Sequence, residues 1–120
     1  MHYNIKGTAL DISPEVRGYV EEKLAHLDKF FVGDSGARAD VEVEHLQGEQ
    51  SKKYRAEFGI VSKSGTFRVE ARGSSLHEAV DLAMGEMSKE IDRSHKRGRG
   101  LVRRGALRIK DFVRGFRSRP

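Results

Sequence analysis

Four basic residues in the second half of the chain share the spacing of one helix face. They stand at positions i, i+4, i+7 and i+8 and are Lys89, Arg93, Lys96 and Arg97. A helix that turns 100° per residue places them within about 100° of one another. Apolar residues occupy the opposite side of the same helix, namely Val80, Met84, Met87 and Ile91. The spacing predicts a core-facing stripe and, opposite it, a basic ridge able to contact phosphates.

The distribution of charge points to the same kind of partner. The chain has a net charge of +5. Residues 1–92 hold 12 Lys and Arg against 17 Asp and Glu, whereas residues 93–120 hold 11 Lys and Arg against a single acid, Asp111. Such a basic C-terminal quarter favours a polyanion, nucleic acid above all, with a solvated tail or a membrane surface as the alternatives.

Several kinds of chemistry are not expected. There is no Cys, which excludes disulfides, thiolate metal sites and a cysteine nucleophile. The five His lack metal-ligand spacing, and no phosphate-binding loop or nucleophile motif occurs. We therefore predict no enzyme, no metal, no cofactor and no small-molecule substrate. No signal peptide or membrane span is apparent, so a cytoplasmic protein without a membrane partner is expected. We also expect the protein to be a monomer.

The elements that would position the ridge can be read from hydrophobic periodicity. Ser13 as N-cap and Pro14 at the first position begin a helix predicted to reach Phe31. Strict alternation predicts strands over 37–45, 53–61 and 66–73, after a first strand over 3–7. The segment 62–65 predicts a tight hairpin in which Gly65 takes a positive φ. Ser75 and Glu78 form a capping box that begins the second helix, which Gly98 and Gly100 are expected to end near Arg97.

This order predicts an α+β fold, β-α-β-β-β-α, in which both helices cover one face of a four-stranded sheet. The first strand–helix–strand unit should be a right-handed crossover between parallel strands. A ferredoxin-like fold is disfavoured because no strand is predicted after the second helix. Residues 1–98 would form this domain and 99–120 a basic extension that is flexible or folds on binding. Apolar residues recur in the extension at helical spacing, so it could also be a basic amphipathic helix for RNA, an acidic protein or a membrane.

From Tyr3 to Gly98 the chain resembles the ribosome hibernation-promoting factor and ribosome-associated inhibitor A family. The resemblance rests on the order and spacing of "NIKG", "DISPEVRGYVEEKLAHLDKFF", "ARADVEVE" and "EARGSSLHEAVDLAMGEMSKEIDRSHKR". It implies a fold like that of a double-stranded-RNA-binding domain. It also implies a cytoplasmic stress or stationary-phase factor that binds the small ribosomal subunit and occludes its decoding channel to transfer and messenger RNA.

The resemblance also implies which residues contact ribosomal RNA. By position these are Arg17, Lys23 and Lys29 on the first helix and Lys89, Arg93, Lys96 and Arg97 on the second. The chain departs from the family at His26, where lysine is common, and at His77, where tyrosine is frequent. The long form in this family has a second domain that pairs ribosomes, and we do not expect these 120 residues to contain it.

The extension is expected to add RNA contacts along the path of messenger RNA, through residues that include Arg99, Arg103 and Arg104. Two alternatives remain at this point. One is a generic double-stranded-RNA-binding module that acts away from ribosomes. The other is a protein- or membrane-interaction adaptor that uses the amphipathic extension.

Overall fold

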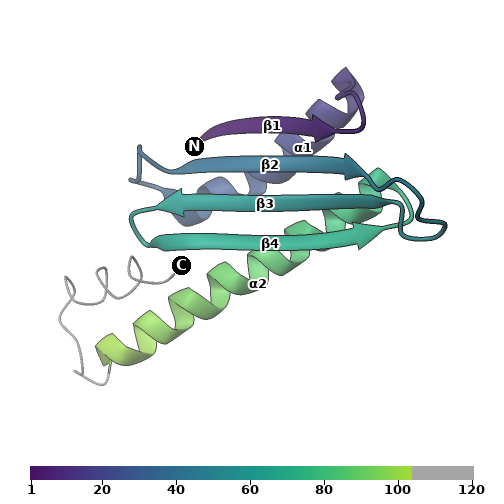
Figure 1. The fold of residues 1–120 in the computed structure, drawn as a ribbon. Helices are drawn as coiled ribbons and strands as arrows, with labels where there is room; N and C mark the ends of the chain where they lie inside the picture. The colour runs from purple at the N-terminus through teal and green to yellow at the C-terminus, as the bar shows by residue number, and fades with distance from the viewer. Residues whose placement is uncertain (104–120) are drawn as a thin grey trace.

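The computed structural model describes the backbone of residues 1–103 and the side chains of residues 1–96. The elements follow the predicted order (Figure 1). They are β1 (His2–Thr8), α1 (Pro14–Leu27), a 3-10 turn η1 (Asp28–Phe31), β2 (Arg38–His45), β3 (Tyr54–Ser62), β4 (Gly65–Gly73) and α2 (Leu76–Arg103). The predicted α+β fold class is confirmed.

The strands form one mixed sheet in the spatial order β1-β2-β3-β4. β1 runs parallel to β2, as the crossover through α1 requires, and Ile5 lies opposite Val41. The remaining pairs are antiparallel hairpin neighbours. Gly65 closes the tight β3–β4 turn with φ of 137°, a conformation that a residue with a Cβ rarely adopts.

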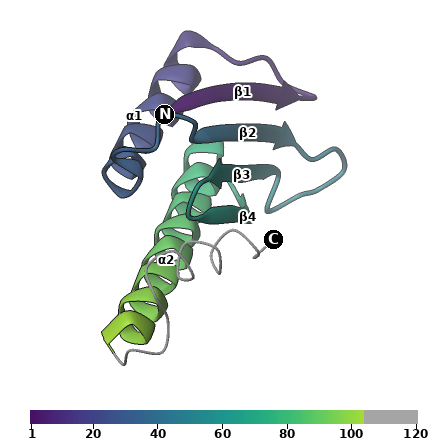
Figure 2. The same ribbon diagram turned by 90° about the vertical axis from the view of Figure 1, so that its left-hand side faces the viewer.

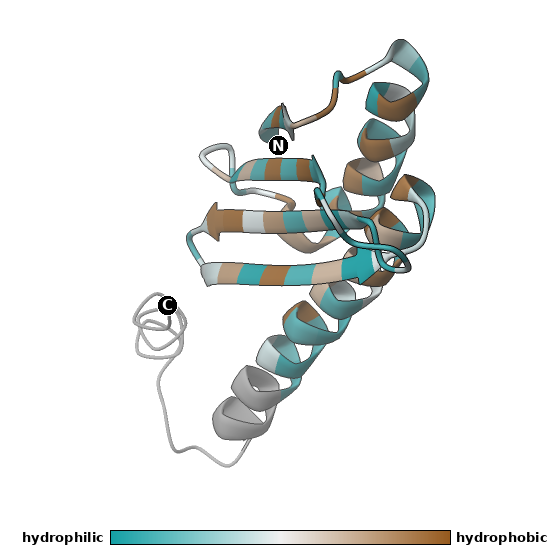
Figure 3. Cartoon of the chain, turned by 45° about the vertical axis from the view of Figure 1, so that its right-hand side comes forward, coloured by the Kyte–Doolittle hydropathy of each residue, from teal (hydrophilic) through white to brown (hydrophobic). Residues whose placement is uncertain are grey.

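Both helices pack on the same face of the sheet, as the turned view shows (Figure 2). The side chains with the largest fully buried volume come from both layers and are Phe58, Leu27, Ile60, Met87, Ile91, Val20, Val43 and Val80. Brown and teal alternate along the strands in Figure 3, because successive strand residues point to opposite faces. One face of the sheet is therefore core, and the other, called here the outer face, is open to solvent.

The predicted caps are present at both helix starts. The Ser13 hydroxyl accepts a hydrogen bond from the Val16 amide. The Ser75 hydroxyl accepts one from the Glu78 amide at 3.1 Å, and the Glu78 carboxylate accepts one from the Ser74 amide at 2.7 Å. In an ideal capping box the Glu78 carboxylate would accept from the amide of Ser75, the N-cap residue, whereas here it accepts from the amide one residue earlier. The close approach also explains Gly73, where a Cβ would come within 2.7 Å of the Ala79 amide nitrogen.

Two predicted helix ends are wrong. The first helix is α-helical to Leu27 and then tightens into η1, which brings Phe31 into the core. The second continues past Arg97, through Gly98 and Gly100, to Arg103. Glycine within a helix costs about 1 kcal/mol relative to Ala, which weakens a helix without obligatorily ending it. The boundary expected after residue 98 therefore falls inside α2, and residues 104–120 lie outside the described part of the chain.

Neither helix, over the residues that the structure describes, has an apolar stretch long enough to cross a bilayer.

Candidate nucleic-acid interface

The solvent side of α2 carries the described part of the basic ridge. Lys89, Arg93 and Lys96 lie on the face opposite the buried Met87 and Ile91. Their side chains are 68%, 55% and 68% exposed. The core contacts of the apolar stripe orient the helix, so the ridge is held outward by packing and is free to meet a ligand.

Each of these three cations has a carboxylate neighbour on the same helix. Lys89 pairs with Glu86 at 3.6 Å and Lys96 with Asp92 at 3.1 Å, while Arg93 donates to Glu90. Exposed pairs of this kind stabilise a helix by only about 0.2–0.5 kcal/mol each. They can therefore be exchanged for a phosphate at little cost. Residues 86–96 hold three acids and three Lys and Arg, so this part of the ridge has no net charge.

Lys23 of α1 faces α2 and takes part in a contact between the helices. Its ammonium lies 3.5 Å from the Asp81 carboxylate and 5.0 Å from the centre of the Tyr19 ring. The Tyr19 hydroxyl donates to the same carboxylate, and this hydrogen bond raises the pKa of Tyr19. Partial burial opposes the charged form of Lys23, but Tyr19 and Asp81 outweigh it and raise the pKa of Lys23. The Asp81 carboxylate of α2 therefore links the two helices through its contacts with Lys23 and Tyr19 of α1.

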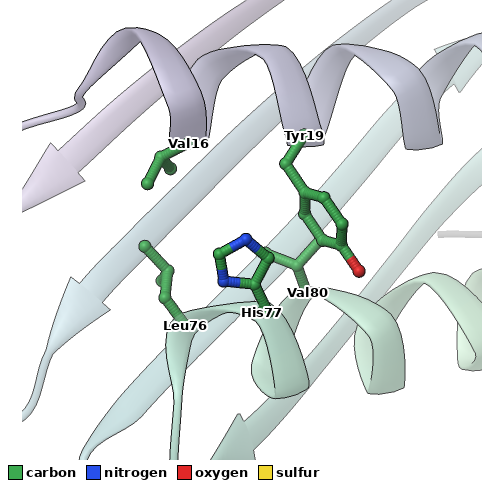
Figure 4. A pocket seen from close by; sticks show the side chains of 5 residues that line it. All are labelled: Val16, Tyr19, Leu76, His77 and Val80. Carbon is green, nitrogen blue, oxygen red and sulfur yellow. The ribbon is translucent and has the colours of Figure 1, made fainter.

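The first turns of α1 and α2 pack directly against each other next to this contact. Val16 and Tyr19 of α1 meet Leu76, His77 and Val80 of α2 and leave no space for a water-sized molecule (Figure 4). The rings of Tyr19 and His77 meet edge to face with 4.4 Å between centroids. The His77 Nε2 atom lies 3.9 Å from a Glu15 carboxylate oxygen. His77 therefore takes a packing position between the helices.

Lys29 lies at the other end of α1, in η1. Its ammonium stands 5.2 Å from the centre of the Phe30 ring. The Phe30 ring in turn contacts the His95 ring of α2, with centroids 5.9 Å apart. The structure therefore brings Lys29 to the turn of α2 that also carries Lys96, and Lys23, Lys29 and the ridge belong to one two-helix surface. We call this surface, from Lys23 and Lys29 to Lys89, Arg93 and Lys96, the helical face.

Arg17 does not join the helical face. It is exposed on the side of α1 that faces Tyr3 of β1, where its charge acts on the Tyr3 hydroxyl. Arg97, Arg99 and Arg103 belong to the last turns of α2, but their side chains are not described. Arg104 lies outside the described residues. These four remain predictions from the sequence.

The outer face of the sheet holds a charge cluster that the sequence did not reveal. Arg55 is only 14% exposed, and its guanidinium contacts the carboxylates of Glu42, Glu44, Glu57 and Glu70 at 2.8–3.4 Å. Its pKa is raised, since these carboxylates outweigh the effect of burial. We call these five residues the Arg55 hub. The pairing Glu44↔Arg55↔Arg72 and Glu42↔Glu57↔Glu70 creates it, and strand register cannot be read from alternation alone.

Beside the Arg55 hub, the outer face has a hollow of about 270 Å³, lined by Asn4, Lys6, Asp40, Val41, Glu42, Glu57 and Arg68. Its two most enclosed carboxylates already have partners. Glu57 accepts from Arg68 at 2.7 Å, and Glu42 accepts from the Thr8 hydroxyl and from Arg55. Within the described residues no group of three metal-ligating side chains occurs. The hollow therefore has a lining of mixed charge.

Comparison with known proteins places the chain in a family. Residues 3–99 match the family described as sigma 54 modulation protein / S30EA ribosomal protein. The chain belongs to this family. The resemblance predicted from the sequence is thereby confirmed, and the match ends within α2, at the first residue of the extension.

Relatives with assigned names support the same grouping. The chain is 31% identical over 96 residues to the ribosome hibernation promotion factor of Bacillus subtilis, covering 80% of this chain and 49% of that protein. It is 29% identical to the protein of the same name from Staphylococcus aureus, covering 76% and 46%. The chain thus spans about half the length of these relatives.

Solved structures match over nearly their whole length. The N-terminal domain of Protein Y from Thermus thermophilus aligns with a TM-score of 0.66 and 30% identity, covering 78% of this chain and 98% of that one. A ribosomal subunit interface protein from Coxiella burnetii aligns with a TM-score of 0.65 and 19% identity, covering 80% and 99%. The second likeness is one of fold alone.

Proposed function

We propose that this protein is a ribosome hibernation factor that binds ribosomal RNA of the small subunit and blocks the channel used by transfer and messenger RNA. One observation carries the proposal: the family match covers 97 of the 120 residues (3–99) and includes every residue of the helical face. The partner would be the small subunit in the cytoplasm, bound by a single copy of the chain. The proposal assigns the protein no catalytic step.

The shape of the molecule supports a mechanism of steric occlusion. Two helices packed side by side on a sheet form a rigid wedge, since their inner sides are fixed in the core. The exposed ammonium and guanidinium groups of Lys89, Arg93 and Lys96 can donate to phosphates, which gives affinity without reading sequence. Specificity would then come from the fit of the helix pair to a folded RNA groove, as is usual for RNA recognition. A wedge seated in the channel excludes other ligands by volume.

Co-sedimentation with purified small subunits tests the proposal. The protein should bind at one copy per subunit at low and moderate salt. Excess transfer RNA with messenger RNA should displace it, because the ligands would share one channel. Binding that these RNAs leave unchanged would move the site elsewhere on the subunit. Equal binding to random duplex RNA would favour a generic RNA-binding module, and liposome binding that depends on Phe112 and Phe116 would favour an adaptor.

The basic extension supplies a further, separable prediction. Residues 99–120 contain eight Lys and Arg and one acid, and we propose that they follow the messenger path. Deleting them should weaken binding to small subunits by at least about tenfold and flatten its dependence on salt, because fewer counterions are released. The measurement is the slope of log affinity against log salt for the full chain and for residues 1–98. An unchanged slope would refute a role for the extension in RNA contact.

A further inference from the structure

The proposed binding to RNA does not explain why the helical face carries carboxylates. Glu86, Glu90 and Asp92 repel phosphates, yet each stands beside a cation of the ridge at a distance of 3.6 Å or less. On α1 the single Asp81 carboxylate likewise engages Lys23. A surface designed only for the tightest possible contact with RNA would omit these acids.

These acids weaken the electrostatic attraction that the ridge exerts on RNA at long range. Opposite charges a few ångströms apart cancel beyond about one Debye length, which is roughly 8–10 Å in physiological salt. The segment 86–96 therefore attracts a passing polyanion weakly. The sequence after Lys96 behaves differently, since residues 97–110 contain six Lys and Arg and no acid.

We infer that Glu86, Glu90 and Asp92 determine specificity, by suppressing binding to generic RNA more than binding to the fitted ribosomal site. This inference rests on the proposed function and deepens it. A loosely bound duplex touches the ridge through one or two phosphates and must still face the carboxylates. A fitted groove presents phosphates to several cations at once, so that each cation exchanges its carboxylate for a phosphate and the acid turns to solvent. Repulsion between these carboxylates and the phosphates of generic RNA thus contributes to specificity, in addition to the attraction between the cations and the phosphates of the ribosomal site.

The exposure of the pairs fits this exchange. The carboxylates of Glu86, Glu90 and Asp92 are 51%, 46% and 52% exposed, so each can rotate into water without leaving a buried charge. Three of the four acids of the Arg55 hub are more enclosed, since Glu42, Glu44 and Glu57 are each about one quarter exposed, whereas Glu70 is 53% exposed.

A charge-matched pair of triple variants tests the inference in the full chain. The first is Glu86→Gln, Glu90→Gln, Asp92→Asn on the helical face. The control is Asp11→Asn, Asp40→Asn, Glu49→Gln, which removes three exposed acids from loops and the outer face. Both are titrated at several salt concentrations against small subunits and against a random-sequence RNA duplex. Circular dichroism and thermal unfolding verify the fold, and the single variant Glu90→Gln provides a graded check.

The helical-face variant should bind the duplex about tenfold more tightly, with a log–log salt slope steeper by about two to three. Its affinity for small subunits should rise by less than about threefold, so that selectivity falls. The control should change duplex binding much less. Equal effects of the two variants, or an equal gain for both RNAs, would overturn the inference. Should the parent protein fail to bind small subunits, the proposed function fails, while the duplex arm still decides whether these acids suppress generic binding.

Discussion

The helical face and the outer face of the sheet contain the same residue types in opposite arrangements. On the outer face, Arg55 is almost enclosed and contacts four carboxylates at once. On the helical face, Arg93 is 55% exposed and has the single neighbour Glu90 among the ion pairs described. A cation held by many acids cannot leave them, whereas a cation with one exposed partner can exchange it. Burial and number of partners thus separate charge that builds the fold from charge that is available for binding.

The largest expected effect tests the structural half of this comparison. Arg55→Ala removes the cation that Glu42, Glu44, Glu57 and Glu70 share, and among the ion pairs described only Glu57 keeps another, with Arg68. We expect a loss of about 2–4 kcal/mol in the free energy of unfolding, because uncompensated, partly buried charges are costly. Urea unfolding measures it.

Arg68 provides the matched control for Arg55. It lies on the same outer face but is 65% exposed and pairs with Glu57. Arg68→Ala should cost less than about 1 kcal/mol. Equal losses for the two variants would show that enclosure does not distinguish them.

The next effect tests the binding half. Replacing Lys89, Arg93 and Lys96 with Ala should weaken binding to small subunits by about 10- to 100-fold and reduce the salt slope by about two to three. The reason is that three phosphate contacts are lost and three acids remain. The free energy of unfolding should change by no more than about 1 kcal/mol, since the pairs are exposed.

The control for this variant removes the same number of charges from the outer face, through Arg38→Ala, Arg68→Ala and Arg72→Ala. It should leave ribosome affinity within about threefold of the parent. If both triple variants lose affinity alike, net charge and not the helical face governs binding.

The smallest effect concerns pH. The hydrogen bond from Thr8, together with Arg55, lowers the pKa of Glu42 below its usual value. A carboxyl with a lowered folded-state pKa contributes stability above its unfolded pKa of about 4.3, and this contribution is lost as pH falls through the folded pKa. Glu42→Gln should therefore be less stable than the parent at pH 7 by about 1 kcal/mol, and the gap should narrow below pH 4. Thermal unfolding between pH 3 and 7 measures it; a gap constant with pH would contradict this origin.

Much of the fold follows from local chemistry. Alternation placed the strands to within two residues, and Ser13, Ser75 and Gly65 marked the helix starts and the hairpin because their roles depend on adjacent backbone groups. The end of α2 could not be predicted in this way. The low helix propensity of Gly98 and Gly100 predicts that the helix ends there. This effect is small, however, compared with the cooperative extension of a helix whose earlier turns are packed in the core.

The candidate site could be predicted only in part. The ridge, and its Glu86–Lys89 pair, can be read from i+3 and i+4 spacing. The approach of Lys29 to α2, the separation of Arg17 from the helical face and the Asp81 contact depend on how two helices pack. The Arg55 hub depends on strand register. Helix packing and strand register both depend on residues far apart in the sequence, so a local pattern does not determine them.

The most direct test of the central claim asks which face of the protein meets ribosomal RNA. The chain has no Cys, so a single introduced thiol can carry a tethered hydroxyl-radical probe. Gly85→Cys places it on exposed α2, where a Cβ has open space, and Asp40→Cys places it on the outer face. On bound small subunits, the probe at residue 85 should cleave ribosomal RNA lining the decoding channel much more strongly than the probe at residue 40. Stronger cleavage from residue 40, or equal cleavage from both, would contradict the account.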